Sequence, residues 1–192
     1  MTTTVTTADR HRPRGVARRA TRLLAVAGLV AGTALSALPA QAATGAMQVP
    51  ATGRVTAAVG GHCSSPGDGH GGVDIAARTG TPVYAADDGV VSLAGTRRGS
   101  ESYGIFVRVH HASGYRTIYA HLSRLAVKPN QKVTKGQVVG YVGNTGRSYG
   151  AHLHFEVRKD NVRQSGINAS FRCRTNVTAG TPISWTFPGL AR

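Results

Sequence analysis

One stretch of this sequence alternates polar and apolar residues without a break: Gly150-Ala151-His152-Leu153-His154-Phe155-Glu156-Val157. Successive side chains of a β-strand point to opposite faces, so the alternation predicts a strand with one apolar and one polar face. The apolar face is typical of a strand that packs on a core. The polar face places His152 and His154 about 7 Å apart and pointing the same way. Two solvent-exposed histidines would give this pattern, and so would a functional site.

The rest of the chain favours an all-β fold. Helical periodicity is nearly absent after the N-terminal segment, and the 25 glycines separate short runs of Val, Ile, Tyr and Thr. Residues 105–110 and 115–122 form the clearest predicted hairpin, with its turn at residues 112–114. Further strands are predicted at residues 54–59, 73–77, 82–86, 89–94, 138–142 and 183–187. We therefore expect an antiparallel β-sheet scaffold in a chain of 192 residues.

The first 42 residues are typical of a secretion signal peptide. Six arginines precede an apolar run at residues 23–38, and Ala40-Gln41-Ala42 fits the small-residue cleavage rule. An uncleaved anchor and a twin-arginine signal are the alternatives, but no hydrophobic pair follows Arg18-Arg19. We expect a secreted protein without a transmembrane segment in its mature chain. Residues 43–60 would be a linker or a short leading strand, and residues 61–192 the functional domain.

The charge balance points to an anionic partner. Without residues 1–42, the chain keeps 17 of its 23 basic and 7 of its 8 acidic residues, a net charge of +10. The basic residues are scattered and no aromatic platform accompanies them, which argues against nucleic acid. An exported basic protein meets the anionic polymers of a cell envelope, which attract it through long-range steering. We expect it to be associated with the cell wall.

The two cysteines, Cys63 and Cys173, lie in the exported part of the chain. An even number of cysteines in an oxidising compartment predicts a disulfide. Such a bond would close a loop over most of the domain and, on the entropy model, stabilise it by roughly 4–5 kcal/mol. Metal ligation by these cysteines is the alternative, but no C-x-x-C spacing supports it.

Three further residues have the chemistry to join the two histidines of the opening strand. His70 and Asp74 are four residues apart at a loop-to-strand junction, and His121 ends the second hairpin strand. Two imidazole nitrogens and one carboxylate oxygen are a ligand set of catalytic zinc, with the fourth position left for water. Taken alone, Asp74 is compatible with a turn cap and His121 with a surface histidine. Their combination in one exported β chain favours a zinc site.

Over residues 67–157 the sequence resembles the lysostaphin/LytM-type zinc endopeptidases that cut peptidoglycan. The shared motifs are His70-Gly71-Gly72-Val73-Asp74, Gly80-Thr81-Pro82-Val83-Tyr84-Ala85-Ala86, Gly114-Tyr115-Arg116-Thr117-Ile118-Tyr119-Ala120-His121-Leu122, Lys135-Gly136-Gln137-Val138-Val139-Gly140 and His152-Leu153-His154-Phe155-Glu156. The resemblance implies a duplicated hybrid β motif, similar to a barrel-sandwich, with an open groove. It also implies a single catalytic zinc ion and peptidoglycan as the substrate.

Carried over by position, the resemblance makes His70, Asp74 and His154 the zinc ligands and leaves His121 and His152 unligated beside them. Zinc lowers the pKa of bound water to about 7 and polarises the scissile carbonyl. A neutral imidazole can accept the proton of that water, and a protonated one can stabilise the oxyanion or the leaving amine. Which of the two histidines performs which step does not follow from the sequence.

Other residues near the motifs have less certain roles. Glu156 shares the polar strand face and is either a partner of a ligand histidine or a surface carboxylate. Tyr119, two residues before His121, is expected to face the groove and line it. The remaining histidines of the exported part, His62 and His110-His111, have no partner motif and are assigned structural roles.

The sequence leaves two rival functions open. A general extracellular zinc protease would share every residue named above. A non-catalytic relative that binds the wall or activates an amidase would have lost metal ligands, whereas this chain retains them all. The loop at residues 60–69 lacks the aromatic and basic residues common in relatives, which leaves the cleavage preference undefined. We expect a monomer.

Overall fold

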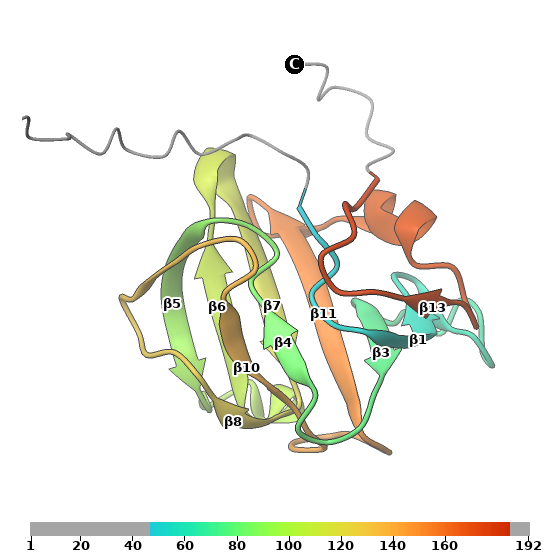
Figure 1. Cartoon of the computed structure of the whole chain (residues 1–192). Coiled ribbons are helices and arrows are strands. Elements are labelled where there is room, and N and C mark those ends of the chain that lie inside the picture. Colours follow the sequence, from blue (N-terminus) through green and yellow to red (C-terminus); the bar gives the residue numbers. More distant parts are fainter. Residues whose placement is uncertain (1–46, 185–192) are drawn as a thin grey trace, which may run out of the picture. The chain divides into compact units, whose positions relative to one another are not determined.

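The computed structural model describes residues 47–184, which are folded almost entirely as β-strands (Figure 1). The strands are β1 (Gly53–Ala58), β2 (Gly61–His62), β3 (Val73–Ala76), β4 (Pro82–Tyr84), β5 (Gly89–Gly95), β6 (Phe106–His110), β7 (Tyr115–Ala120), β8 (Leu122–Leu125), β9 (Lys132–Val133), β10 (Val138–Val142), β11 (His152–Lys159), β12 (Val162–Arg163) and β13 (Asn176–Val177). Three short 3-10 helices are η1 (Glu101–Tyr103), η2 (Ala112–Gly114) and η3 (Ser165–Ser170). Within these residues no helix has the length and apolar character needed to cross a membrane.

Two antiparallel sheets make up the fold. The larger has the order β13-β1-β3-β11-β7-β6-β5-β9, with β2 pairing with β1 and β12 with β11. The smaller has the order β4-β10-β8. In Figure 1 the long strand β11 runs through the middle of the larger sheet, between β3 and β7. The predicted all-β antiparallel scaffold is confirmed.

The apolar side chains of the alternating sequence that predicts β11 pack on the core, as expected. Leu153, Phe155 and Val157 are buried in the main core, where the Phe155 ring packs against Tyr119 and Phe171. Burial of such apolar side chains contributes roughly 1.5–3 kcal/mol each. This packing fixes the register of β11, because a shift by one residue would turn its histidines into the core.

The predicted strands agree with the structure except at the C-terminus. The hairpin of β6 and β7 forms as expected, with Val109 opposite Thr117. The predicted strand at residues 183–187 is not found in its described part, residues 183–184, where Ile183 is buried without belonging to a strand. Residues 159–180, where no strand is predicted from the sequence, contain β12, η3 and β13.

The segment that precedes the motifs belongs to the folded body. Met47, Val49 and Ala51 are buried in the main core, and β1 pairs with both β3 and β13. The described part of the expected linker or leading strand, residues 47–60, contains β1. The expected signal peptide, residues 1–42, lies outside the described residues.

Two glycine turns give the smaller sheet a repeated pattern. Gly80 precedes β4 and Gly136 precedes β10, and both have a positive φ that favours glycine. The amide of Gly80 donates to Val142 at the end of β10, and that of Gly136 donates to Ala85 just after β4. Each turn is thus bonded to the end of the other strand, as expected of a duplicated motif.

A disulfide joins Cys63 and Cys173, whose Cα atoms are 5.5 Å apart. It connects the loop before the His70 motif to the segment that leads into β13. The predicted disulfide is confirmed, and the described residues contain no free cysteine.

Candidate metal centre

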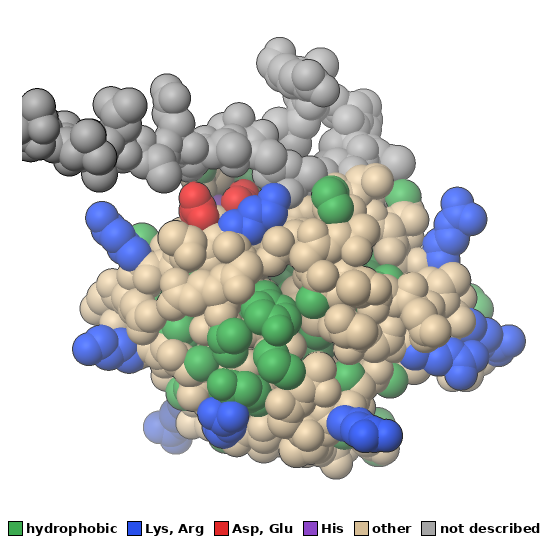
Figure 2. Space-filling model, in the orientation of Figure 1, with side chains coloured by type: hydrophobic (Ala, Val, Ile, Leu, Met, Phe, Trp, Pro, Cys, Tyr) green, Lys and Arg blue, Asp and Glu red, His purple; other side chains and the backbone are tan. Residues whose placement is uncertain are grey.

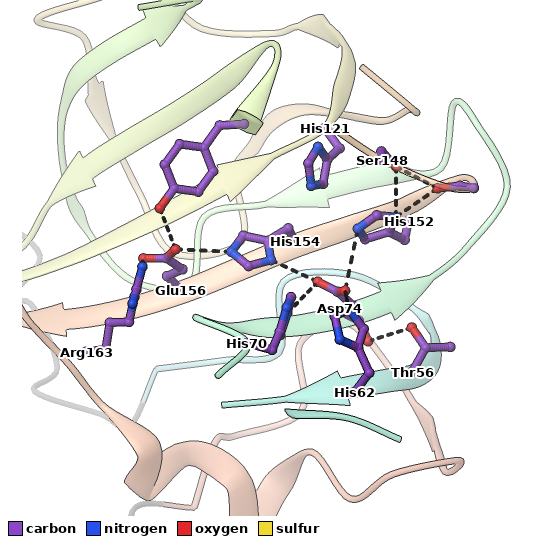
Figure 3. Close-up of polar contacts among 12 residues, drawn as sticks. Thr56, His62, His70, Asp74, His121, Ser148, His152, His154, Glu156 and Arg163 are labelled. Carbon is purple, nitrogen blue, oxygen red and sulfur yellow. Dashed lines mark hydrogen bonds and ion pairs between the residues drawn. The ribbon is translucent and has the colours of Figure 1, made fainter. Parts of the chain in front are cut away.

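The pairing of β3 with β11 places Asp74 directly opposite His154. Oδ1 of the Asp74 carboxylate lies 2.9 Å from Nδ1 of His154 and 3.0 Å from Nε2 of His70. Figure 3 shows the His70 and His154 rings pointing toward Asp74 from the two sides of its strand. The structure therefore brings together the three residues that the sequence predicts as metal ligands.

The glycine of the His70 motif makes room for this arrangement. A Cβ atom on Gly72 would lie 2.6 Å from the carbonyl oxygen of Phe155 and 2.8 Å from Cε1 of His154. Carbon atoms essentially never approach protein atoms so closely. Glycine at this position thus allows β3 to approach the His154 ring.

The electrostatics of Asp74 and His154 are those of a buried ion pair. Burial alone would raise the pKa of the Asp74 carboxyl, but hydrogen bonds from His154 and His70 hold that pKa far below its usual value. Burial alone would lower the pKa of His154, but hydrogen bonds to Asp74 and Glu156 raise it to about 9. Imidazole and carboxylate are held together here in a site that is only 5–6% exposed.

Glu156 holds the second ring nitrogen of His154. Its Oε1 accepts from Nε2 of His154 at 3.1 Å and from the Tyr103 hydroxyl at 2.6 Å, and Arg158 donates to Oε2 at 2.6 Å. Burial would raise the pKa of Glu156, but these hydrogen bonds lower it to about 2. The carboxylate is 1% exposed, so it is not a surface group. Both carboxylates accept, so the protonated His154 ring donates from Nε2 to Glu156 and from Nδ1 to Asp74.

His121 and His152 are each oriented by a backbone carbonyl. Nδ1 of His121 lies 2.8 Å from the oxygen of Thr145, and Nδ1 of His152 lies 2.8 Å from that of Gly150. A carbonyl only accepts, so each Nδ1 donates and each neutral ring keeps Nε2 as a proton acceptor. The two ring centroids are 4.6 Å apart. Burial lowers the pKa of His121 to about 4, although the hydrogen bond to Thr145 opposes this.

A close backbone contact brings the Thr145 carbonyl to His121. Gly104 and Gly146 both have a positive φ, and a Cβ on Gly146 would lie 2.3 Å from the amide nitrogen of Gly104. The Thr145 hydroxyl donates to the carbonyl of Leu122 and accepts from the amide of Ile105. These bonds tie the turn at residues 143–146 to the first residue of β8 and to the residue before β6.

The expectation that Tyr119 lines the groove is wrong. Its side chain is fully buried in the main core, and its hydroxyl accepts from the amide of Ala86 and from the Thr117 hydroxyl. The reason is a break in the strand alternation: β7 ends at Ala120, and His121 has a φ of +60°. His121 therefore does not share the strand face of Tyr119.

The candidate site lies in a groove with a volume of about 550 Å³. Its lining joins the loop at residues 147–151 to the predicted site residues. The lining residues are Thr56, His62, His70, Asp74, Ala76, His121, Arg147, Ser148, Tyr149, Gly150, Ala151 and His152. The groove is open on the outside, as the sequence predicts, and Tyr149 on its rim is 94% exposed.

The structural roles assigned to the other histidines hold only in part. His111 bonds to the carbonyl of Asp88 and the hydroxyl of Thr117, which fits a structural role. His62, in contrast, lines the groove, and its ring centroid lies 4.4 Å from that of His70. Sequence reasoning missed His62 because its position, eight residues before His70, matches no ligand spacing.

Tyr103 was missed as well, and so was the role of Thr145. Tyr103 belongs to η1, and its hydroxyl donates to Glu156, which is 53 positions away in the sequence. No local sequence pattern predicts this hydrogen bond. Thr145 contacts His121 through its backbone carbonyl, while its hydroxyl holds the turn in place. The only available signal was the turn sequence Gly143-Asn144-Thr145-Gly146.

The donor set of this site fits a divalent metal ion. An anionic carboxylate oxygen and two imidazole nitrogens converge at 2.9–3.0 Å within one buried site, and Glu156 fixes the tautomer of one of these imidazoles. Imidazole with carboxylate suits zinc and other transition metals. A carboxylate behind a ligand histidine is the usual support of such a ligand.

Comparison with known proteins gives a consistent picture. The family model described as "Peptidase family M23" matches residues 68–166. The chain is 48% identical over 89 residues to the DD-carboxypeptidase/endopeptidase Mpg of Neisseria meningitidis, a match that covers 46% of this chain and 20% of the relative. It is 47% identical over 100 residues to the peptidoglycan DD-endopeptidase ShyA of Vibrio cholerae, covering 52% of this chain and 22% of the relative. The matched segment thus spans about a fifth of these curated relatives.

A solved structure agrees with these matches. The crystal structure of a zinc-containing peptidase from Vibrio cholerae superposes with a TM-score of 0.54 and 33% identity, over 62% of this chain and 38% of that one. The matched family segment contains every residue predicted from the motifs, from His70 to Glu156. The chain belongs to peptidase family M23.

Proposed function

We propose that this chain is a secreted zinc endopeptidase that hydrolyses peptide bonds in the stem peptides or cross-links of peptidoglycan. The observation that carries the proposal is the convergence of His70 and His154 on the buried Asp74 carboxylate, at the floor of an open groove. Two further imidazoles, His121 and His152, stand beside this cluster with Nε2 free to accept a proton.

The metal ligands in this proposal are Nε2 of His70, a carboxylate oxygen of Asp74 and Nδ1 of His154, which hold one zinc ion. Support comes from the donor set and from the zinc-containing relative of similar fold. When bound, zinc acidifies water and polarises the carbonyl group of the scissile peptide. Glu156 keeps Nε2 of His154 occupied as a donor, so that Nδ1 remains available as the ligand atom.

Proton transfer falls to His121 and His152 in this proposal. The carbonyls of Thr145 and Gly150 hold the Nδ1 protons of these rings, so each ring in its neutral form accepts at Nε2. The low pKa of His121, about 4, keeps that ring uncharged at neutral pH. One ring can take the proton of the attacking water, and a protonated ring can stabilise the oxyanion or protonate the leaving amine.

The proposed substrate follows from the relatives and from the shape of the groove. Relatives at 47–48% identity are named as enzymes that act on DD bonds, one of them explicitly on peptidoglycan. The groove is open, which suits flexible wall peptides with small or D-configured residues. A bond within a DD cross-link is the first candidate.

The positive charge supports attraction to the wall rather than recognition of one bond. Figure 2 shows Lys and Arg side chains set apart from one another round the margin of the face it presents. Such scattered charge raises the local concentration of the enzyme near anionic polymers through long-range attraction. We therefore propose a wall-associated, extracellular location.

Digestion assays separate the proposal from its rivals. The mature protein is incubated with purified cell walls and with casein, each with and without a chelator. The proposal predicts loss of wall turbidity that the chelator and His154→Ala abolish, with little digestion of casein. A general protease would digest casein as well. A non-catalytic wall-binding protein would leave wall turbidity unchanged by wild type and variant alike.

A further inference from the structure

We infer that His62, outside the ligand set of the motifs, is a further metal-ligating side chain of this centre, which then has five positions, four on the protein and one for water. One ring or carboxylate atom each of His62, His70 and Asp74 lies within 4.8 Å of the others. Imidazole nitrogens and carboxylate oxygens are both zinc ligands, so the three side chains offer suitable donor atoms close to one another. This inference rests on the proposed function, because it requires the metal centre described above.

The two oxygens of Asp74 divide the imidazoles between them. Oδ1 faces His70 and His154, at 3.0 and 2.9 Å. Oδ2 faces His152 and His62, whose Nε2 atoms lie 3.6 and 3.7 Å away. The distance from His62 Nε2 to Asp74 Oδ2 is too long for a hydrogen bond. The Nε2 atom of His62 therefore lies near the carboxylate without being hydrogen-bonded to it. In Figure 3 the His62 ring lies beside Asp74 and His70, and all three residues line the groove.

The other ring nitrogen of His62, Nδ1, is hydrogen-bonded to a carboxylate, as the second nitrogen of a metal-ligating histidine often is. Nδ1 of His62 bonds to Oδ2 of Asp68 at 2.5 Å, and Oδ1 of the same carboxylate accepts from the amide of His70 at 3.2 Å. Ligand histidines almost always donate their other nitrogen to a carboxylate, a carbonyl or water. Asp68 thus accepts a hydrogen bond from His62 as Glu156 does from His154. Its second oxygen also accepts from the amide of His70 and so fixes the start of the His70 motif.

The backbone supports this placement from two sides. His62 is in β2, opposite Ala57 of β1, and the next residue is Cys63 of the disulfide. The loop that carries the ring is therefore anchored to the sheet and to the C-terminal segment. The side chain is 45% exposed, so it contributes little to the core and its removal leaves the fold intact.

A metal-binding experiment tests the inference. Zinc affinity is measured by competition with a chromophoric chelator for wild type, His62→Ala, Asp68→Asn and the exposed control His110→Ala, each first stripped of metal. The same proteins are loaded with Co²⁺ and their visible absorption is recorded. We expect His62→Ala to weaken zinc binding at least about tenfold and to change the Co²⁺ bands, and Asp68→Asn to weaken binding about tenfold with His62 still present.

The outcomes separate this inference from the proposed function. Unchanged zinc affinity and Co²⁺ spectra in His62→Ala, while His154→Ala loses the metal, would overturn the role of His62 and leave the proposed function standing. A wild-type protein that binds no zinc would overturn both. Unfolding curves in EDTA and titration of free thiols show whether each variant keeps its fold and its disulfide.

Discussion

Asp74 and His154 lie opposite each other on β3 and β11, with Oδ1 of the carboxylate 2.9 Å from Nδ1 of the ring. This pairing joins two motifs 80 positions apart in the sequence into one site. The register is fixed by the buried face of β11 and the orientation of the ring by Glu156, so several residues outside the ligand set are needed to hold it. The predictions below test these supports in turn.

Gly72→Ala should weaken zinc binding at least about tenfold while leaving the protein folded, because the new Cβ would displace the His154 ring or the β11 backbone. The matched control is Gly150→Ala, since a Cβ on Gly150 meets no atom within 4 Å. Isothermal titration with zinc measures both variants. Equal affinities for the two would show that the space beside Gly72 is not needed.

Glu156→Gln should lower zinc affinity about 10- to 100-fold, because the amide replaces the carboxylate that accepts from Nε2 of His154. Its protein should also be less stable, since Arg158 loses an anionic partner in a site that is 1% exposed. Asp160→Asn serves as the control at an exposed carboxylate. Zinc competition and urea unfolding give the two readouts. A zinc affinity equal to that of the control would contradict the role of Glu156.

The stability of the metal-free protein should fall as the pH drops from 6.5 toward 4, partly because of His121. Its pKa is about 4 in the fold against 6.5 for the free side chain, so the unfolded chain binds this proton first. The contribution is present in full above pH 6.5 and reaches roughly 3 kcal/mol at most. His121→Gln should therefore lose less stability than wild type over this interval, measured by urea unfolding in EDTA. Parallel curves for the two proteins would refute this.

Replacing both cysteines by serine should lower the free energy of unfolding by roughly 4–5 kcal/mol, because the Cys63–Cys173 bond closes a span of 110 residues. Chemical reduction of the wild-type protein provides the matched control, since it breaks the same bond without changing the sequence. Guanidinium unfolding compares the three. If the oxidised wild type is no more stable than the reduced one, the disulfide does not stabilise the fold.

Much of this architecture could be predicted from the sequence. The alternation in β11 and the glycine turns at Gly80 and Gly136 each have a local cause, namely the period of a strand and a backbone with positive φ. The gathering of His70, Asp74 and His154 followed from matching the order of the motifs with that of a known family. The features that lie within the motifs, namely the strand alternation, the glycine turns and the predicted ligand residues, could therefore be predicted from the sequence.

The remainder depends on contacts that the sequence does not announce. Tyr119 was placed in the groove because strict alternation was extended through His121, where the positive φ turns the chain. Tyr103 reaches Glu156 from a separate loop, and the backbone carbonyls of Thr145 and Gly150 orient His121 and His152. Long-range packing and backbone acceptors decide these details.

The division of labour between the two histidines of β11 is the central claim, and one paired measurement tests it. Zinc content and release of soluble muropeptides from purified walls are measured for wild type, His154→Ala and His152→Ala. His154→Ala should lose both the zinc and the activity. His152→Ala should keep the zinc and lose about 10²- to 10⁴-fold in activity. A His154→Ala protein that retains zinc and cleaves walls at the wild-type rate would contradict the account.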